Sequence, residues 1–307
     1  MEVIRDWNRA LLFTGQGIQP EDVIKYASQL REIDEDLLEA NTYAAEKNSG
    51  LPIADYLVRP EGIFTNNAAL QMVVHTLNVT AGDLALTKFG DTNGLVAAGH
   101  SLGEVAAFDI ARVFLTRAES MEFVSFRGRF MQRDHEQGPG NLYRIDGLTE
   151  EQLLSVSLEL EISPALINGP TLLMVGSNVD RNDLEEPLKE AGARRVMDLK
   201  IPAFHTFYMA RAQTDLEAYN RQRKYQTASF YIVSNYDGEP GLDGYELLVK
   251  HITSITNPVR WTDVIATINH PGVTFYTLGP GSNLAALNRL NGVPKERTKD
   301  LLQLLAE

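Results

Sequence analysis

One five-residue stretch limits the folds open to this chain more than any other. It reads Gly99-His100-Ser101-Leu102-Gly103, follows a short apolar run over 94–99 and precedes a helical pattern that contains Val105, Ala106 and Phe108. The pattern Gly-x-Ser-x-Gly between a strand and a helix is typical of a tight turn that lifts a serine hydroxyl to a helix N-terminus, where backbone N–H groups can receive an oxyanion. The alternative is a plain turn whose serine only caps the helix. The strand and helix context favours the first interpretation.

The order of apolar runs predicts an α/β fold. The run over 9–13 ends at the glycine-rich stretch 14–17, as expected for a buried strand followed by a turn. Helical spacing follows over 20–48 and over 66–86, before the strand at 94–99. Strands that alternate with helices favour a parallel sheet covered on its faces. Together with the serine turn, this order predicts an α/β-hydrolase-like core.

The middle of the chain predicts a small inserted subdomain. Its expected elements are, in order, strand, helix, strand, strand, helix and strand, over 141–145, 149–158, 163–168, 172–176, 181–191 and 195–199. This βαββαβ order within about 60 residues is that of a ferredoxin-like unit. We therefore expect a discontinuous large catalytic domain over 1–137 and 201–307, interrupted by a small subdomain over 138–200.

Composition excludes several classes of protein. The 307 residues include 28 Lys and Arg against 41 Asp and Glu, and this formal net charge of −13 opposes binding to nucleic-acid phosphates. The absence of cysteine excludes disulfides, thiolate metal sites and a cysteine nucleophile. No apolar run reaches the roughly 18 residues of a membrane span, and the first six residues lack the features of a signal peptide. We expect a cytoplasmic protein with no nucleic-acid or membrane partner.

A serine nucleophile needs a base, and six histidines are available. His205 follows Ile201-Pro202-Ala203-Phe204, a loop where the chain re-enters the large domain, and catalytic groups concentrate on such loops. His100 is next to the serine and badly placed as its base, because adjacent residues on a sharp turn point apart. The others are interpreted as structural or solvated: His75, His135, His251 and His270. We therefore expect His205 to be the base.

Two arginines lie among apolar residues late in the helix predicted before residue 137. They are Arg127 and Arg129, and the apolar members of the same face include Met121 and Phe123. An arginine sunk in such a face usually has an anionic partner, and its planar guanidinium suits a carboxylate. The alternative is an ordinary cation favoured by the helix dipole near the helix end.

At this point the sequence resembles a known family, the malonyl-CoA:acyl carrier protein acyltransferases of fatty acid and polyketide synthesis. Six short motifs, in the family's order, carry the resemblance over nearly the whole chain. They are Phe13-Thr14-Gly15-Gln16-Gly17, Gly99-His100-Ser101-Leu102-Gly103-Glu104, Arg127-Gly128-x-x-Met131-Gln132, Ala203-Phe204-His205, Asn257-Pro258-Val259-Arg260-Trp261 and Leu278-Gly279-Pro280-Gly281. Such a set is far more specific than any one of its members.

The resemblance implies a role for each matching residue. Ser101 corresponds to the nucleophile and His205 to the general base and then acid. The family orients this histidine with a backbone carbonyl rather than an aspartate, and that position corresponds to about Ser254. The oxyanion hole would consist of the backbone N–H groups of Gln16 and Leu102.

The acyl pocket can be carried over in the same way. The resemblance implies that Arg127 binds the free carboxylate of malonate and that His100 and Asn168 line the pocket. Two positions depart from the family pattern. Thr14 replaces a proline and frees one N–H, and Asn67 stands where the family has a longer glutamine that supports the nucleophile loop.

The resemblance implies an S-malonyltransferase that works by a ping-pong mechanism through a serine-linked acyl-enzyme. The substrates would be malonyl-CoA and the phosphopantetheine thiol of an acyl carrier protein, with no cofactor and no metal, and we expect a monomer. Candidate cations for an acidic carrier are Lys189, Arg194, Arg195, Lys200 and Arg289. An acyl hydrolase that clears carrier proteins is the main alternative, and Arg127 disfavours it because a neutral chain needs no carboxylate partner. A non-catalytic docking module and a triad lipase are further alternatives, and the choice between fatty acid and polyketide assembly stays open.

Overall fold

The computed structural model describes residues 6–138 and 140–307. The start of the chain, on which the signal-peptide expectation depended, therefore lies outside the described residues except for Asp6, and so does Pro139 beside the predicted subdomain boundary. In the described part of the chain, no helix combines the length and apolarity needed to cross a membrane.

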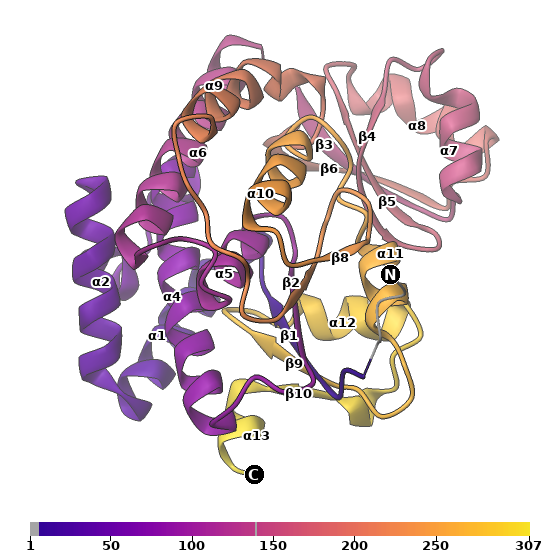
Figure 1. Ribbon diagram of the computed structural model, residues 1–307. Coiled ribbons are helices and arrows are strands. Elements are labelled where there is room, and N and C mark those ends of the chain that lie inside the picture. The colour runs from indigo at the N-terminus through magenta and orange to yellow at the C-terminus, as the bar shows by residue number, and fades with distance from the viewer. Residues whose placement is uncertain (1–5, 139) are drawn as a thin grey trace.

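A six-stranded sheet forms the centre of the molecule (Figure 1). Its strand order is β10-β9-β1-β2-β7-β8, and every neighbouring pair is parallel except β7 and β8. The strands are β1 (Arg9–Phe13), β2 (Leu95–Gly99), β7 (Tyr231–Val233), β8 (Pro240–Gly241), β9 (Thr274–Leu278) and β10 (Thr298–Asp300). The central pair, β1 and β2, is apolar along nearly its whole length because both faces are covered. The predicted α/β class with a parallel sheet is confirmed.

Side chains alternate between two cores on either face of this sheet, as strand geometry requires. Leu11 and Phe13 pack into one core, and Ala10 and Leu12 pack into the other. The first core is covered by α1 (Pro20–Ile33), α2 (Glu35–Ser49), α3 (Ile53–Val58), α4 (Asn67–Phe89), α5 (Leu102–Ile110), α6 (Arg117–Gln137), α9 (Ala210–Asn220), α10 (Gly244–Thr253) and α13 (Leu301–Leu305). The second core is covered by α11 (Trp261–Ile268) and α12 (Asn283–Leu290). Three short 3-10 helices complete the chain, η1 (Ile63–Thr65), η2 (Phe207–Met209) and η3 (Lys295–Arg297).

A second, four-stranded antiparallel sheet stands beside the large one (Figure 1). Its order is β4-β5-β3-β6, with β3 (Asn141–Asp146), β4 (Ser163–Gly169), β5 (Leu172–Ser177) and β6 (Arg195–Pro202). The helices α7 (Glu150–Ser157) and α8 (Arg181–Glu190) pack on it around a separate core. The predicted element order is confirmed, including a capping box between Thr149 and Gln152 that begins α7.

The sheets are joined where β4 meets the chain between α10 and α11. The Ile167 N–H donates to the Val259 carbonyl over 2.9 Å, and the Val259 N–H donates to the Ala165 carbonyl over 2.9 Å. A contact of 2.7 Å between His100 Nε2 and Asn168 Oδ1 brings the end of β4 to the serine turn that follows β2.

Several predicted boundaries are wrong in detail. The single helix expected over 20–48 is two helices, because Asp34 takes an extended backbone (φ −156°, ψ 90°) and its side chain accepts the Leu37 N–H at the start of α2. The strand expected over 195–199 continues to Pro202, which brings the chain to the loop before His205.

Candidate active site

The site lies at the carboxyl ends of the parallel strands, where ligands bind in open α/β sheets. Ser101 follows β2 directly, and its backbone is strained (φ 53°, ψ −111°). A Cβ on Gly99 would lie 1.9 Å from the Gly103 carbonyl carbon, and a Cβ on Gly103 would lie 2.1 Å from the Phe13 carbonyl oxygen. Both glycines are therefore required by close backbone packing, which is why the turn has this sequence.

The Ser101 hydroxyl is hydrogen-bonded to one histidine. Its Oγ lies 2.6 Å from His205 Nε2, and His205 Nδ1 lies 2.6 Å from the Ser254 carbonyl oxygen. Burial is the main cause that lowers the pKa of His205 to about 3, and the charge of Arg127 lowers it further. The neutral imidazole then donates from Nδ1 to Ser254 and accepts the serine proton at Nε2. The predicted histidine and the predicted carbonyl thus lie on either side of one ring.

Arg127 extends from α6 toward the same serine. It is fully buried, with Nη1 donating to Gln71 Oε1 over 2.7 Å and Nη2 donating to Ser101 Oγ over 3.2 Å. Burial lowers its pKa to about 10, so the guanidinium remains cationic at neutral pH. Among the residues described, no carboxylate lies within ion-pair distance of it, and its Nε has no partner. A buried cation in this state is suited to an anionic ligand.

The oxyanion hole is predicted to consist of two backbone N–H groups. Gln16 lies in the turn after β1, and Leu102 is the first residue of α5, where helix N–H groups are free. Neither N–H has a hydrogen-bond acceptor among the described residues. The Gln16 side chain donates to Asn67 Oδ1 over 2.6 Å, and Asn67 Nδ2 donates to the Gly128 carbonyl over 3.0 Å. The side chain of Asn67 therefore bonds the turn after β1 and helix α6 rather than the serine turn itself.

The two residues predicted to line the acyl pocket, His100 and Asn168, contact each other. His100 Nε2 lies 2.7 Å from Asn168 Oδ1 at the end of β4, and the His100 ring packs 5.3 Å from the ring of Trp261. Asn291 Nδ2 donates to the Asn168 carbonyl over 2.8 Å, which joins α12 to the same corner. His100 thus points away from the Ser101 hydroxyl, as expected for a residue that is not its base.

With this geometry established, comparison with known proteins is decisive for the family. Residues 11–275 match the model of the acyl transferase domain family. The chain belongs to this family.

Individual relatives and solved structures agree with the acyltransferase assignment. The chain is 28% identical over 221 residues to the malonyl CoA-acyl carrier protein transacylase of Haemophilus influenzae, covering 70% of this chain and 69% of that protein. It is 27% identical over 297 residues to the corresponding protein of Mycobacterium tuberculosis, covering 94% and 96%. The malonyl CoA-acyl carrier protein transacylase structure from Coxiella burnetii superposes with a TM-score of 0.86 at 21% identity, covering 99% and 96% of the two chains. A malonyl-transacylase bound to a type II polyketide acyl-carrier protein superposes with a TM-score of 0.84 at 22% identity, covering 97% and 99%.

Two polar groups of this acyltransferase were not singled out from its sequence as site residues. Gln71 faces Arg127 from α4, and Asn235, just after β7, hydrogen-bonds the backbone of the serine turn. Asn235 closely follows the carboxyl end of a short strand, at the same edge of the sheet as Gln16 and Ser101. This position was the feature of the sequence that could have indicated a site residue. Gln71 had no such signal, because α4 is buried almost all round and its polar residues look like core positions.

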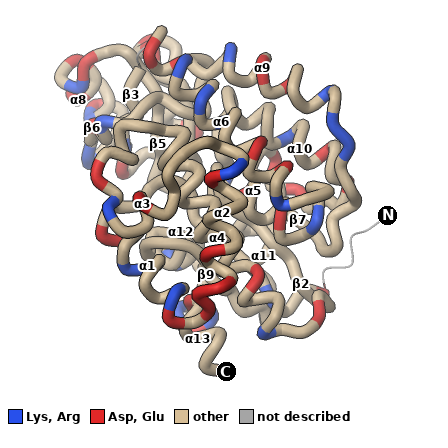
Figure 2. The backbone as a smooth tube through the Cα atoms, turned by 90° about the vertical axis from the view of Figure 1, so that its left-hand side faces the viewer, with Lys and Arg blue, Asp and Glu red and all other residues tan. Residues whose placement is uncertain are grey.

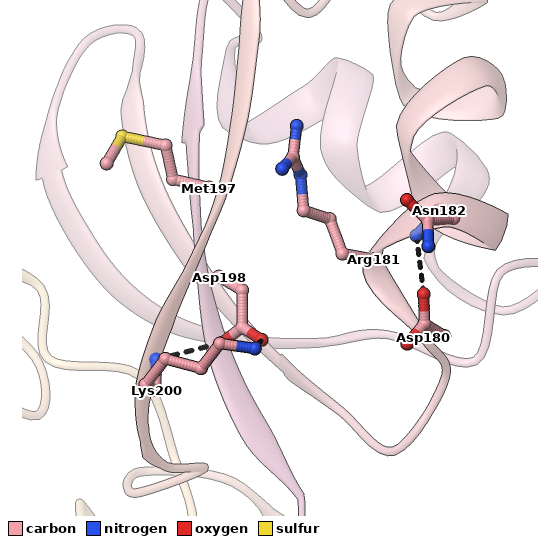
Figure 3. Close-up of a pocket in the computed structure, with 6 residues that line it drawn as sticks. All are labelled: Asp180, Arg181, Asn182, Met197, Asp198 and Lys200. Carbon is pink, nitrogen blue, oxygen red and sulfur yellow. Dashed lines mark hydrogen bonds and ion pairs between the residues drawn. The ribbon is translucent and has the colours of Figure 1, made fainter.

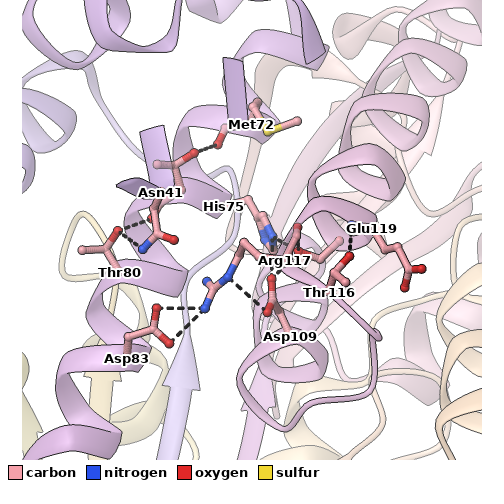
Figure 4. Close-up of polar contacts among 11 residues, drawn as sticks. Asn41, Met72, His75, Thr80, Asp83, Asp109, Thr116, Arg117 and Glu119 are labelled. Carbon is pink, nitrogen blue, oxygen red and sulfur yellow. Dashed lines mark hydrogen bonds and ion pairs between the residues drawn. The ribbon is translucent and has the colours of Figure 1, made fainter. Parts of the chain in front are cut away.

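A second buried polar cluster anchors the far end of α5 (Figure 4). Arg117 donates to both oxygens of Asp83 over 2.9 and 2.8 Å, and its Nε lies 3.4 Å from Asp109 Oδ1. His75 Nε2 lies 3.3 Å from Ser120 Oγ and 3.6 Å from Asp109 Oδ2. Despite its serine, histidine and aspartate, this cluster lies inside the core, and it fixes α4, α5 and α6 to one another.

Two of the candidate cations for a partner already pair with acidic side chains. On the face turned toward the viewer in Figure 2, Lys and Arg are interspersed with Asp and Glu. Lys189 pairs with Glu185 and Glu186, and Lys200 pairs with Asp198, so neither is a free cation.

The charged side chains that line the surface hollow around Lys200, of about 340 Å³, likewise bond to their neighbours (Figure 3). There Asp180 accepts the Asn182 N–H at the start of α8, and Arg181 pairs with Glu185. In the described ranges, no group of three His, Asp or Glu side chains is arranged to hold a metal ion.

Proposed function

We propose that this acyltransferase moves a malonyl group from malonyl-CoA to the phosphopantetheine thiol of an acyl carrier protein, for fatty acid or polyketide synthesis. The observation that carries the proposal is Arg127, a fully buried cation that has no anionic partner among the described residues and whose Nη2 lies 3.2 Å from the Ser101 hydroxyl. A malonyl thioester bound at Ser101 would bring its free carboxylate to this guanidinium. The names of the relatives and the complex with a carrier protein support the substrate and the partner.

In the first half-reaction, Ser101 Oγ attacks the thioester carbonyl carbon while His205 Nε2 takes the hydroxyl proton. The N–H groups of Gln16 and Leu102 stabilise the oxyanion that forms. When the C–S bond breaks, His205 returns its proton to the CoA thiolate. Because the Ser254 carbonyl holds Nδ1–H, the base keeps the tautomer that this sequence of steps requires.

The second half-reaction reverses these roles. The phosphopantetheine thiol gives its proton to His205 and attacks the acyl-enzyme carbonyl, and Ser101 leaves and recovers the proton. Only proton and acyl transfers are involved, so we propose that no cofactor or metal takes part. We propose that the enzyme works in the cytoplasm as a monomer; the monomer is supported because the nucleophile, base, carboxylate partner and oxyanion N–H groups all come from one chain.

We also propose the finer description of the architecture. Residues 1–137 and 201–307 form an α/β-hydrolase-like domain, supported by the parallel strand order and the serine turn after β2. Residues 138–200 form a ferredoxin-like subdomain, supported by the antiparallel order β4-β5-β3-β6 of a βαββαβ segment. Asn168, in this subdomain, faces His100 in the large domain and supports an acyl pocket between the two.

Intact mass spectrometry tests the function. The protein is mixed with malonyl-CoA, acetyl-CoA, methylmalonyl-CoA and a long-chain acyl-CoA, with and without a phosphopantetheinylated carrier protein. We expect a malonyl adduct on the enzyme that is lost in Ser101→Ala and that moves to the carrier. Preferential acylation by the long-chain acyl-CoA, with release of free acid rather than transfer, would establish the hydrolase instead.

A further inference from the structure

The strained serine turn is held from outside by one amide side chain. Asn235 Oδ1 accepts the Ser101 N–H over 2.9 Å, and Asn235 Nδ2 donates to the Gly99 carbonyl over 2.6 Å. These two bonds bind the peptide groups on either side of His100. Because Ser101 has a positive φ of 53°, its backbone persists only where surrounding contacts hold it.

Asn235 is in turn held by a buried carboxyl group. Glu104, on the first turn of α5, is fully buried, and its Oε1 accepts the Asn235 N–H over 2.8 Å. Its Oε2 lies 2.6 Å from His251 Nδ1 on α10. Burial raises the pKa of Glu104 to about 8 and lowers the pKa of His251 well below its usual value. The carboxyl group of Glu104 therefore links the nucleophile helix both to Asn235 and to α10.

His251 makes this one polar contact through its side chain. The imidazole is fully buried, its ring packs edge-on to Phe108 at 5.7 Å, and no described residue bonds its Nε2. One turn later, Ser254 Oγ donates to the His251 carbonyl over 2.7 Å. The Ser254 carbonyl is the group that accepts Nδ1–H of His205. His251 is thus fixed to the nucleophile helix at its side chain and to the orienting carbonyl at its backbone.

Together these contacts make a closed ring of linked residues that includes the catalytic dyad, Ser101 and His205. It runs in the order Ser101, Asn235, Glu104, His251, Ser254, His205 and back to the Ser101 hydroxyl. We propose that Glu104 and His251 are positioning residues for the acyl transfer, fixing the spacing between the serine on α5 and the carbonyl at the end of α10 that orients His205. This inference goes beyond the proposed function and rests on it only for the identity of the dyad.

The magnitude at stake follows from the geometry of proton transfer. The serine and histidine must stay within hydrogen-bond reach, and a misplacement of about 1 Å caused by a distant change can slow a reaction about a hundredfold. Loss of the bond between Glu104 and His251 frees α10 to shift relative to α5. We expect acylation to slow by about ten- to a hundredfold.

Three substitutions of His251 separate positioning from packing. The amide of His251→Asn places a hydrogen-bonding group where Nδ1 stood, the amide of His251→Gln places it near the former Nε2, and His251→Leu has no such group. The single-turnover rate of Ser101 acylation is measured by intact mass over a range of acyl-CoA concentrations. We expect the maximal rate to fall in the order wild type, Asn, then Gln and Leu together. The half-saturating concentration should stay unchanged, because His251 does not bond the groups that would hold the acyl chain.

The matched control is His75→Leu. His75 lies on α4 and contacts Asp109 near the other end of α5. His75 is also fully buried beside a carboxylate and also has a pKa lowered by burial, and it lies in the cluster of Figure 4, away from the dyad. Both leucine variants should lower the melting temperature, whereas only His251→Leu should slow acylation at a temperature where both are folded. The comparison of Asn with Gln decides the question if His251→Leu does not fold.

The proposal is overturned if the rates follow side-chain volume, with Leu and Gln faster than the smaller Asn, or if the His75 and His251 variants are slowed equally. The assay uses whichever acyl-CoA forms the largest adduct with the wild type. Failure of the malonyl assignment then shows in the choice of acyl group, and failure of the positioning role shows in the order of the variants. A wild type acylated by none of the acyl-CoAs would refute both.

Discussion

Replacement of Arg127 by alanine separates a dicarboxylate transferase from every enzyme for neutral acyl groups. In the free protein, the guanidinium is fully buried and donates to Gln71 and Ser101, and no carboxylate in the described part of the chain is bonded to it. Malonyl would supply that carboxylate, and acetyl would not. The substitution should therefore damage the reaction of malonyl-CoA selectively.

The magnitude can be bounded from these contacts. Removing one partner of a buried charged pair costs about 2–5 kcal/mol, which corresponds to roughly thirtyfold to several thousandfold in kcat/KM. Arg127→Ala also leaves Gln71 Oε1 without its donor and removes a charge that lowers the pKa of His205. Both of these effects are shared by the two substrates. The ratio of the malonyl-CoA rate to the acetyl-CoA rate therefore isolates the carboxylate contact.

The assay measures kcat/KM with malonyl-CoA and acetyl-CoA for the wild type, Arg127→Ala and Arg127→Lys. We expect Arg127→Ala to lose malonyl-CoA activity and to accept acetyl-CoA as well as or better than before. Arg127→Lys should recover part of the loss, because an ammonium keeps the charge without the planar pair of donors. Arg129→Ala is the matched control on the same helix, since Arg129 donates to the Ser49 carbonyl instead. Equal losses for both substrates would make Arg127 a structural cation and refute the reasoning.

Three further predictions concern the base, acid stability and carrier binding. Acylation by malonyl-CoA should stay at its neutral rate down to about pH 5, because the pKa of His205 is lowered to about 3 and the imidazole remains a base; a stopped-flow profile with its midpoint near 6.5 would contradict this. The melting temperature should fall as pH drops below about 6.5, because histidines become protonated in the unfolded chain while the buried ones stay neutral in the folded state. The free energy of unfolding then falls by up to about 1.4 kcal/mol per pH unit for each such proton. Glu104 has the opposite effect on stability, since its raised pKa makes the folded state bind one proton that the unfolded chain releases above about pH 4.5. A melting temperature that rises on acidification to pH 5 would contradict the expectation that the histidines outweigh Glu104. The histidines concerned are His75, His100, His205 and His251. Arg289→Glu should raise the KM for the carrier protein more than Arg195→Glu does. Arg289 lies on α12, which is bonded to Asn168 beside the site, whereas Arg195 begins β6 roughly 23 Å along the strand from Pro202. The reverse order of the two KM values would place the carrier elsewhere.

Local pattern was sufficient wherever a feature depends on neighbours in the chain. The alternation of apolar runs predicted the parallel sheet, and the βαββαβ order of the small sheet followed from short runs and turns. The serine turn was predictable because two glycines are needed where backbones approach within about 2 Å of a Cβ position. The same local reasoning did not find the break at Asp34, because an amphipathic pattern continues across it and only the extended backbone ends α1.

The partners of the site depend on contacts between distant parts of the chain. A backbone carbonyl carries no residue-type signal, so Ser254 could be placed only by resemblance until the fold brought it to 2.6 Å from His205. Glu104 and His251 are 147 residues apart; Glu104 was named only as the last residue of the serine motif, and His251 was interpreted as structural. A buried polar side chain can be distinguished from an ordinary core position only by its partner.

The sequence by itself therefore determined the elements and the chemical groups: a strand, serine and helix in one local unit, a histidine on a loop, and an arginine on an apolar helix face. The tertiary structure alone decided which of these groups meet. Ser101 and His205 are separated by 104 residues, and a 2.6 Å contact between them exists only because β2, β6 and α10 are packed into one arrangement. Periodicity records which side of an element is buried, and it does not record which distant side chain lies opposite.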